Sequence, residues 1–405
     1  MHGSSAPSPL PRRGRLAALA LALLAALGGL LTAVPASAGV EALPGRVIRE
    51  TLAPGIQFIR VVDEATPRRI FILRIDPRKT ATVDVALAGK AMPVLAKLSE
   101  IVARTGAIAG VNGDFGTVNP GRPTHPFAED GELVQTALQN VAMFSVSRDG
   151  SKVFLGAQEF GPQIGLEVPS LGRTLKIDRW NRGGPALGEI AAFSTRGGTL
   201  EPVPGSLCAT RLMPSGDPKV ATQGGGAVRA YEVARSTCSQ EPMKRKGGLV
   251  LTAQPGTDQA GDLLSLRPGA TVRVRWTFGW QGTFDAIGGG PMLVSGGAIT
   301  SEACTSSVCN AAPRTAVGVT ADGIILLVVV DGRQTGWSRG LGILELAQLM
   351  LDLGCQRAMN LDGGGSTTMV VNGKVVNRPS DGFERGITSA IVIHDGADPG
   401  EASFG

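Results

Sequence analysis

The residues best suited to chemistry lie near the carboxyl end of the chain, in the segment Asn360–Thr368, which reads NLDGGGSTT. Asp362 stands where a short apolar strand is predicted to end; three glycines and three hydroxyl side chains follow it. Consecutive glycines let the backbone approach a ligand closely and turn its N–H groups toward an anionic oxygen. No lysine follows them at the spacing of a P-loop. The segment indicates either an anion site or a turn that needs glycine for geometry alone.

Three arginines lie beside comparable breaks in the chain, each next to a proline or an acidic residue: Arg314, Arg378 and Arg385. A guanidinium group suits phosphate because its planar fork donates two parallel hydrogen bonds. A single surface arginine is more often simply solvated. Three arginines beside glycine-rich loops favour an anion site.

Four carboxylates are available to such a site, at Asp114, Asp331, Asp362 and Glu384. Hydrolysis of a glycosidic bond commonly uses two carboxylates, one as acid and the other as base or nucleophile. The sequence does not give their separation, so retaining and inverting outcomes both stay open. A metal-dependent alternative would need the three aspartates to converge as oxygen ligands. We expect no metal and no cofactor.

Histidine is scarce, since only His125 and His394 lie beyond the first 40 residues. Catalytic zinc usually takes two or three histidines, so the composition argues against a histidine-based zinc site. A Ser-His-Asp triad would have only these two residues to serve as its base. The composition therefore favours chemistry carried by carboxylates and arginines.

Short strands and few helices are predicted to position these residues. The apolar run 108–111 is typical of a buried strand that ends at Asn112 and presents Asp114 from a glycine-bracketed loop. The clearest helical pattern covers 340–353 and stops at Gly354. The other predicted elements are a helix over 94–102 closed by Gly106, strands at 56–62, 70–75, 83–87, 249–252, 272–278, 315–320, 324–330, 358–361 and 389–394, and hairpins at 142–155 and 367–377.

These patterns predict an α+β fold of mixed, mainly antiparallel β-sheet with few helices. The predicted segments are a signal peptide at 1–38, an N-terminal strand-rich segment at 39–90, a main domain at 91–395 and a tail at 396–405. Within the main domain, about 156–247 is rich in glycine and proline and has weak strand patterns. We interpret it as an irregular, strand-rich insertion.

The first 38 residues have the three parts of a secretory signal: arginines between positions 12 and 15, an apolar run over 16–34, and the small-residue site Ala36-Ser37-Ala38. An uncleaved membrane anchor is the alternative, because the run is long enough to span, and twin-arginine export stays open. Removing the segment takes away three arginines and no acid, so the formal net charge falls from +5 to +5 − 3 = +2. We expect a secreted protein with no stable membrane insertion after cleavage and no nucleic-acid partner.

Export makes disulfides possible for the five cysteines. We predict the pairs Cys208–Cys238 and Cys304–Cys309, with Cys355 left as a buried thiol after a helix. The alternative is that all five are reduced core residues.

The carboxyl-terminal motifs closely resemble those of the phosphodiester glycosidase family. They run from the Pro-Arg-Thr at 313–315, through Asp331-Gly332-Arg333, to NLDGGGSTTMVVNGKVVNRPSD and Glu384-Arg385. The upstream VNGDF at 111–115 and GGGP at 288–291 also look like family motifs. The resemblance covers roughly 90–395, with 156–247 matching poorly, and makes 91–395 the catalytic domain.

The resemblance implies hydrolysis of the sugar C1–O bond of a glycosyl-1-phosphodiester or phosphate-containing glycan, releasing a free sugar and a phosphomonoester. Asp114 or Asp362 would activate water or stabilise the cationic sugar, while Glu384 would react or orient Arg385. The arginines and the N–H groups of the three glycines would hold the phosphate. The residues implied to bind substrate are Asn112, Arg314, Thr315, Asn360, Gly363, Gly364, Gly365, Ser366, Thr367, Arg378 and Arg385.

Two departures from the family pattern bear on sugar specificity: Gly116 stands where many members have a second aromatic residue, and Ala312 where many have histidine. Two alternative functions stay open. One is a non-catalytic protein that binds anionic cell-wall glycans, and the other is a phosphodiesterase that breaks the P–O bond.

Overall fold

The computed structural model describes residues 1, 3, 39–117, 121–136, 142–157, 163–197, 207–216, 221–223, 226–239, 243, 245–277, 280, 282–300 and 309–396. The chain divides into two units, Met1–Ser37 and Ala38–Gly405, and every element below belongs to the second. Apart from residues 1, 3 and 396, the predicted signal peptide and tail lie outside the described residues. No helix in the described part of the chain is long and apolar enough to span a membrane.

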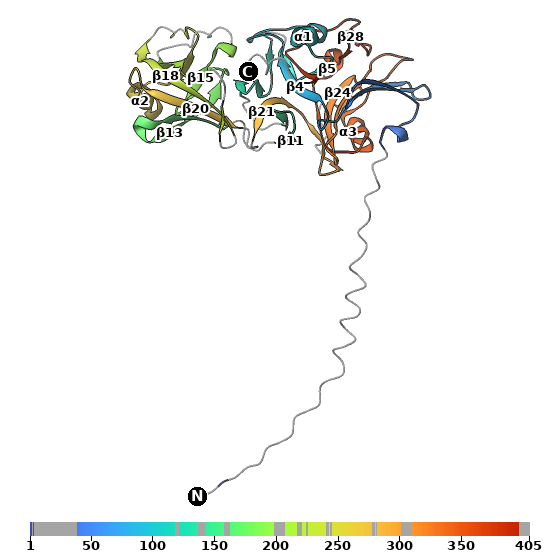
Figure 1. Cartoon of the computed structure of the whole chain (residues 1–405), viewed down its shortest axis with the longest axis horizontal. Coiled ribbons are helices and arrows are strands. Elements are labelled where there is room, and N and C mark those ends of the chain that lie inside the picture. The colour runs from blue at the N-terminus through green and yellow to red at the C-terminus, as the bar shows by residue number, and fades with distance from the viewer. Residues whose placement is uncertain are drawn as a thin grey trace. The chain divides into compact units, whose positions relative to one another are not determined.

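Antiparallel β-sheet dominates the second unit (Figure 1). An eight-stranded sheet has the order β1-β2-β3-β25-β24-β26-β22-β23, with all neighbours antiparallel. Its strands are β1 (Arg46–Ala53), β2 (Ile56–Asp63), β3 (Arg68–Ile75), β22 (Met292–Ser295), β23 (Ala298–Ile299), β24 (Arg314–Thr320), β25 (Ile325–Val330) and β26 (Cys355–Asn360).

Three smaller groups of strands complete the part of the fold that carries the candidate site. One five-stranded sheet is β28 (Lys374–Val375), β27 (Met369–Val371), β5 (Ala109–Asn112), β29 (Ser389–Asp395) and β4 (Ala81–Leu87). The other is β11 (Val153–Ala157), β10 (Ala142–Ser147), β21 (Thr283–Gly289), β8 (Phe127–Glu129) and β9 (Glu132–Gln135). The pair β6 (Gly116–Thr117) and β7 (Arg122–Pro123) lies between β5 and β8 in the chain.

The central strands of the eight-stranded sheet are buried on both faces, which explains why β25 is apolar at every position. Successive side chains of a strand point to opposite faces. Ile325, Leu327 and Val329 therefore join the large core that includes residues of β4, β5 and β29. The alternate residues Leu326 and Val328 pack in a second core with helix α3 (Ile343–Asp352). Helix α1 (Leu98–Thr105) covers β4 and β29 in a third core.

The described strands of the predicted insertion belong to one sheet. Nine strands form it: β12 (Gln163–Val168), β13 (Arg173–Ile177), β14 (Arg179–Trp180), β15 (Ala191–Phe193), β16 (Leu207–Pro214), β17 (Ala221–Gln223), β18 (Gly226–Ser239), β19 (Leu249–Ala253) and β20 (Thr271–Thr277). Because β19 and β20 belong to it, the sheet extends to residue 277, beyond the expected end near 247. Its core also includes Leu133, Met143 and Ala286, so it packs against the β8–β10–β21 sheet.

The expected fold class is confirmed, as are both hairpins and the two predicted helices, although α1 begins at Leu98 rather than at 94. Gly106 ends α1 in the left-handed conformation, as its position predicted. Helix α2 (Asp258–Ser265) was not predicted. It is short, and only Ala260 and Leu263 along its length are buried, so its apolar pattern was too weak to recognise.

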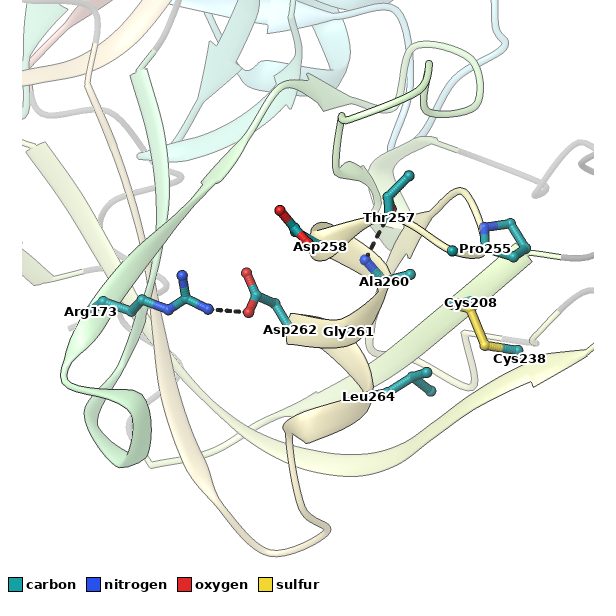
Figure 2. A pocket seen from close by; sticks show the side chains of 11 residues that line it. Arg173, Cys208, Cys238, Pro255, Thr257, Asp258, Ala260, Gly261, Asp262 and Leu264 are labelled. Carbon is teal, nitrogen blue, oxygen red and sulfur yellow. Dashed lines mark hydrogen bonds and ion pairs between the residues drawn. A yellow bond between two sulfur atoms is a disulfide. The ribbon is translucent and has the colours of Figure 1, made fainter.

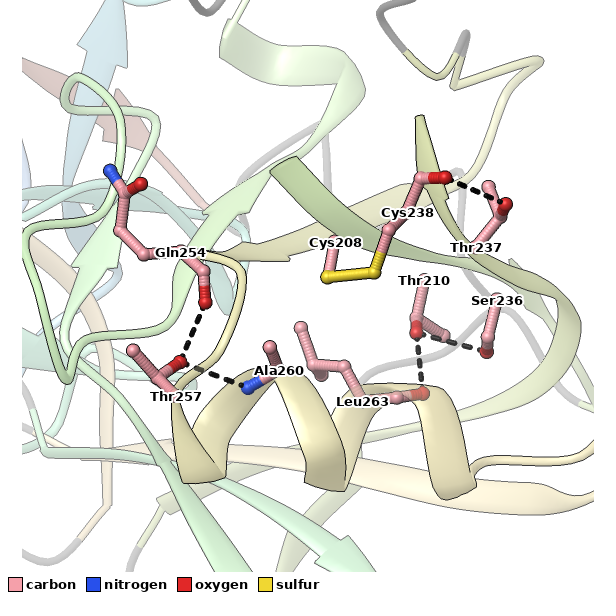
Figure 3. The surroundings of a disulfide bond; sticks show 9 residues. All are labelled: Cys208, Thr210, Ser236, Thr237, Cys238, Gln254, Thr257, Ala260 and Leu263. Carbon is pink, nitrogen blue, oxygen red and sulfur yellow. Dashed lines mark hydrogen bonds between the residues drawn. A yellow bond between two sulfur atoms is a disulfide. The ribbon is translucent and has the colours of Figure 1, made fainter. Parts of the chain in front are cut away.

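The Cys208–Cys238 disulfide is confirmed and joins facing positions of β16 and β18 (Figure 3). Helix α2 lies beside it, where the Thr210 hydroxyl donates to the Leu263 carbonyl at 2.8 Å. Cys355 is a buried free thiol, as expected, and burial raises its pKa to about 12. Cys309 is disulfide-bonded, but Cys304 lies outside the described residues, so the second pairing stays a prediction.

Candidate active site

Three strand ends meet at one place: the end of β5, the start of β24 and the end of β26. Asn112 holds them together. Its amide donates to the Asp362 carbonyl at 2.7 Å, and its Oδ1 accepts from the Thr315 hydroxyl at 2.7 Å and the Thr368 N–H at 3.1 Å. Asn112 and Thr315 are fully buried and bonded to each other. The structure therefore gives these two predicted substrate-binding residues a positioning role.

Asp114 lies beyond the end of β5, and its carboxylate is fully buried against His125. Oδ2 accepts from the His125 backbone N–H at 2.7 Å, and Oδ1 lies 2.6 Å from Nδ1 of the ring. Burial raises the pKa of Asp114, and the hydrogen bonds and charge of His125 oppose that rise. Both oxygens of the Asp114 carboxylate therefore contact His125, a partner that the sequence did not indicate.

Asp362 lies next to Asp114 because its backbone N–H donates to the Gly113 carbonyl at 3.0 Å. Its Oδ1 accepts from the Gly363 N–H at 2.9 Å, and the Ser366 side chain also hydrogen-bonds to it. Burial raises the pKa of Asp362, and the nearby charge of Asp114 raises it further, while the hydrogen bonds lower it. Two predicted catalytic carboxylates are thus brought together.

Two N–H groups of the triglycine loop donate to other groups of the fold. The Gly363 N–H donates to its neighbour Asp362, and the Gly364 N–H donates to the Pro313 carbonyl at 2.9 Å. Both donors have partners inside the fold, and binding of phosphate by these two glycines stays a prediction. Gly364 has φ +63°, a conformation that favours glycine.

Each glycine of the loop lies against a different arginine. A methyl group on Gly363 would lie 3.7 Å from Arg314 Nη1, one on Gly364 would lie 3.2 Å from Arg333 Nη1, and one on Gly365 would overlap Arg385 Nη2. The missing side chains therefore allow three guanidinium groups to approach the loop. The lack of side chains at these glycines lets the arginine guanidinium groups lie close to the loop backbone.

The arginines of this cluster differ in how freely they can meet a ligand. Arg314 is buried and donates to the Leu341 carbonyl at 2.9 Å and the Asn310 carbonyl at 2.7 Å. Burial lowers its pKa, and the charge of Arg333 lowers it further. Arg333 is exposed. Arg385 is 42% exposed and bonded to Asp381 through Nε at 3.0 Å and Nη2 at 2.7 Å.

The Arg378 guanidinium lies over the Trp337 ring, 5.7 Å from its centroid, and its contact with substrate stays a prediction. The position of Arg378 depends on Asp331, whose carboxylate accepts from the Arg378 N–H at 3.1 Å, from Trp337 Nε1 at 2.8 Å and from Asn377 at 3.0 Å. Burial raises the pKa of Asp331, and these donors oppose the rise. Asp331 is thus a buried organiser of the turn that leads to Arg378.

Glu384, the third predicted catalytic residue, bonds to the start of helix α1. Its two carboxylate oxygens accept from the Ser99 N–H at 3.0 Å and the Ser99 hydroxyl at 2.6 Å. A carboxylate at a helix N-terminus satisfies a free N–H and stabilises the helix. These contacts explain its position without a role in the reaction.

Two buried polar atoms near the loop have no partner among the described residues: Oδ1 of Asn360 and Oγ1 of Thr367. Both residues are 1% exposed, and the Asn360 amide donates to the Gly290 carbonyl at 2.9 Å. Buried polar atoms are normally satisfied. Their position in the predicted segment fits the expected substrate contacts of both residues.

Gly288 and Gly289 bring a neighbouring sheet close to the site. A methyl group on Gly288 would overlap the His125 side chain, and one on Gly289 would lie 2.7 Å from the Asn360 carbonyl oxygen. These glycines therefore let β21 pack closely against the His125 segment and against the end of β26.

The described residues also contain a cavity of about 630 Å³ beside helix α2, lined by the Cys208–Cys238 disulfide, Thr257 and the Arg173–Asp262 ion pair (Figure 2). None of the predicted catalytic or substrate-binding residues lines it. Within the described part of the chain, no group of three or more His, Cys, Asp and Glu side chains is arranged to hold a metal ion.

Sequence reasoning missed His125, Arg333 and Asp381. Arg333 belonged to a recognised motif and follows a glycine, and its φ of +59° shows a special turn. Asp381 stands four residues before Arg385 and closes the motif that ends in PSD, so a charge pair could have been suspected. His125 carried no local signal, because its meeting with Asp114 depends on tertiary structure.

Residues 218–394 match the family model described as phosphodiester glycosidase. The SPbeta prophage-derived uncharacterized protein YomE of Bacillus subtilis (strain 168) is 38% identical over 92 residues, which cover 23% of this chain and 14% of that protein. N-acetylglucosamine-1-phosphodiester alpha-N-acetylglucosaminidase of Bos taurus is 36% identical over 89 residues, which cover 20% of this chain and 16% of that protein. The chain thus matches less than a fifth of the length of either relative.

Among solved structures, a hypothetical protein from Synechocystis has the same fold, with a TM-score of 0.67 and 20% identity over 87% of this chain and 64% of that chain. The family match covers the stretch that contains Arg314, Asp362 and Arg385, and it begins after Asn112 and Asp114. Over residues 218–394, this chain is similar to the phosphodiester glycosidase family.

Proposed function

We propose that the protein is a secreted glycosidase-type hydrolase that cleaves the C1–O bond of a glycosyl-1-phosphodiester. One observation supports this most directly. Asp362 lies next to Asp114 and begins a loop against which Arg314, Arg333 and Arg385 all pack. Negative groups that can stabilise a cationic sugar thus adjoin positive groups that can neutralise a phosphate.

The roles follow from exposure. Arg333 is exposed and Arg385 is partly exposed, so both can meet the phosphate, while buried Arg314 holds the loop. A phosphomonoester is a good leaving group once its charge is neutralised, so strong general-acid help is unnecessary. Asp362 would face the developing positive charge at C1. Glu384 would position Arg385 through their adjacency in the chain.

The substrate class comes from the Bos taurus relative, whose name specifies an N-acetylglucosamine-1-phosphodiester. We propose glycosyl phosphodiesters of this kind, free or within a phosphate-containing glycan. The predicted signal segment and the Cys208–Cys238 disulfide support export, because structural disulfides persist mainly outside the cytosol.

Hydrolysis of N-acetylglucosamine 1-(methyl phosphate) in ¹⁸O-labelled water tests the proposal. We expect release of N-acetylglucosamine carrying the label at its new hydroxyl. Label in methyl phosphate would mean P–O cleavage and overturn the proposal. Binding of the probe without any released sugar would favour the non-catalytic alternative.

Replacement of the two aspartates checks the site assignment. Asp114→Asn and Asp362→Asn should each lower turnover by orders of magnitude while circular dichroism shows an intact fold. Near-full turnover in both variants would contradict this site.

A further inference from the structure

His125 and Asp114 form a hydrogen-bonded pair in which the carboxylate is buried and the histidine is partly exposed. The Asp114 side chain is 0% exposed, whereas the His125 side chain is 18% exposed. Two contacts from one residue, at 2.6 and 2.7 Å, fix the histidine relative to the carboxylate. The ring is therefore anchored on one side and reaches solvent on the other.

The contact with Asp114 decides which ring nitrogen can act as a base. Asp114 lies against Nδ1, so in the neutral ring the proton belongs on Nδ1 and the lone pair on Nε2. The described residues provide no hydrogen-bond partner for Nε2. A histidine oriented by a buried carboxylate, with the far nitrogen free, is the arrangement that general bases use.

Neighbouring residues hydrogen-bond to the segment around His125 and pack against it. The Thr124 N–H donates to the Phe115 carbonyl at 2.8 Å, which ties the His125 segment to the Asp114 segment. Buried Gln135 donates to the His125 carbonyl at 3.2 Å, and Gly288 leaves room for the histidine side chain. Such support from outside the reacting groups is what a precise catalytic geometry needs.

We propose that His125, oriented by Asp114, accepts the proton of the attacking water, while Asp362 faces the cationic sugar; this assignment rests on the proposed function. The water oxygen bonds to C1 as the C1–O bond to phosphate breaks, and the electron pair of that bond leaves on the phosphate oxygen. One water proton passes to Nε2, and Asp114 stabilises the imidazolium. The products are a free sugar and a phosphomonoester, and His125 returns its proton to solvent.

Turnover of N-acetylglucosamine 1-(methyl phosphate) by full-length variants tests this role. His125→Gln and His125→Ala should lower kcat about 10²–10⁴-fold, the usual contribution of a general base. Added imidazole should restore part of the activity of His125→Ala, because it supplies the missing base in the space left by the side chain. His394→Gln is the matched control, since it removes the other described histidine, which lies on β29, and should leave kcat unchanged.

The outcomes separate the two proposals. No released sugar from the wild-type protein would overturn the proposed function, and this role with it. An active wild type with kcat of His125→Gln within threefold of it would overturn the role of His125 alone. A folded His125→Ala variant that loses activity and gains nothing from imidazole would show that His125 only supports the structure, which also overturns the proposal.

Discussion

The folded protein disfavours the ionised form of Asp362, because burial and the neighbouring Asp114 both raise its pKa. A carboxyl group whose pKa is raised on folding weakens the folded state as the pH rises from the unfolded pKa through the folded one. The unfolded pKa of aspartate is about 4. An ionised Asp362 therefore costs stability at neutral pH, as expected of a group retained for function.

Asp362→Asn should separate stability from activity. The asparagine amide cannot ionise and keeps an oxygen that can accept from the Gly363 N–H. The melting temperature of the variant should therefore exceed that of the wild type at pH 7. The difference should shrink as the pH falls toward about 4, while turnover is lost at every pH. Thermal unfolding across this range measures it. A variant less stable than the wild type throughout would contradict the explanation.

Arg333, rather than Arg378, should bind the phosphate. Arg333→Ala should raise KM for a glycosyl phosphodiester about 10–100-fold, because a hydrogen bond to a charged group contributes about 1.5–3 kcal/mol. Arg378→Ala is the matched control. It removes a guanidinium stacked on Trp337, so we expect a stability loss of about 0.5–1 kcal/mol and a smaller change in KM. A larger increase in KM for Arg378→Ala than for Arg333→Ala would instead support Arg378 as the residue that binds the phosphate.

The sequence indicated the residue types of the site better than their contacts. Asp114 and Asp362 were recognised because each follows a predicted strand, and strand ends are visible in a single sequence. Arg333 was not chosen as a site residue because its sequence position does not reveal that it approaches Gly364. The partnership of Asp114 with His125 accompanies the pairing of β6 with β7, which no local pattern specifies.

At the scale of elements, helix α1 connects the fold to the site through Glu384. Glu384→Ala leaves the Ser99 N–H without its acceptor, so we expect a loss of about 1 kcal/mol in the free energy of unfolding, as for other helix caps. Turnover should stay within about tenfold of the wild type, since both carboxylate oxygens of Glu384 accept hydrogen bonds from Ser99. Urea unfolding and kcat measure the two effects. A loss of several orders of magnitude in kcat at unchanged stability would make Glu384 catalytic after all.

Strands and helices with a strong apolar period were predictable, and weakly patterned ones were not. The run ILLVVV of β25 could only be a buried strand, and α3 showed a clear helical period. The nine-stranded sheet was unclear because exposed positions interrupt its buried ones: in β13, only Leu175 and Ile177 are buried. Sheet order was not predictable, because β3 pairs with β25 across some 250 residues of chain.

At the scale of the whole molecule, the nine-stranded sheet is mechanically connected to the His125–Asp114 pair. Asn181, just after β14, donates to the Val134 carbonyl at 2.8 Å and to the Ser194 hydroxyl at 2.8 Å, and accepts from the Ser194 N–H at 2.8 Å. Val134 precedes Gln135, whose side chain holds the His125 carbonyl. The sheet that sequence reasoning set aside as an insertion thus supports the segment that carries the proposed base.

Asn181→Gly should therefore reduce activity from a distance. Asn181 has φ +52°, which glycine adopts without strain, so the change removes the buried side chain and its hydrogen bonds without straining the backbone. We expect a loss of about 1–3 kcal/mol in the free energy of unfolding. We also expect kcat to fall at nearly constant KM, because His125 would shift while Arg333 and Arg385, which are proposed to bind the phosphate, would not. Asn372→Gly, in the β27–β28 turn with φ +49°, is the matched control and should leave kcat unchanged. Equal kcat values for the two variants would mean that the nine-stranded sheet contributes stability alone and that His125 keeps its geometry without it.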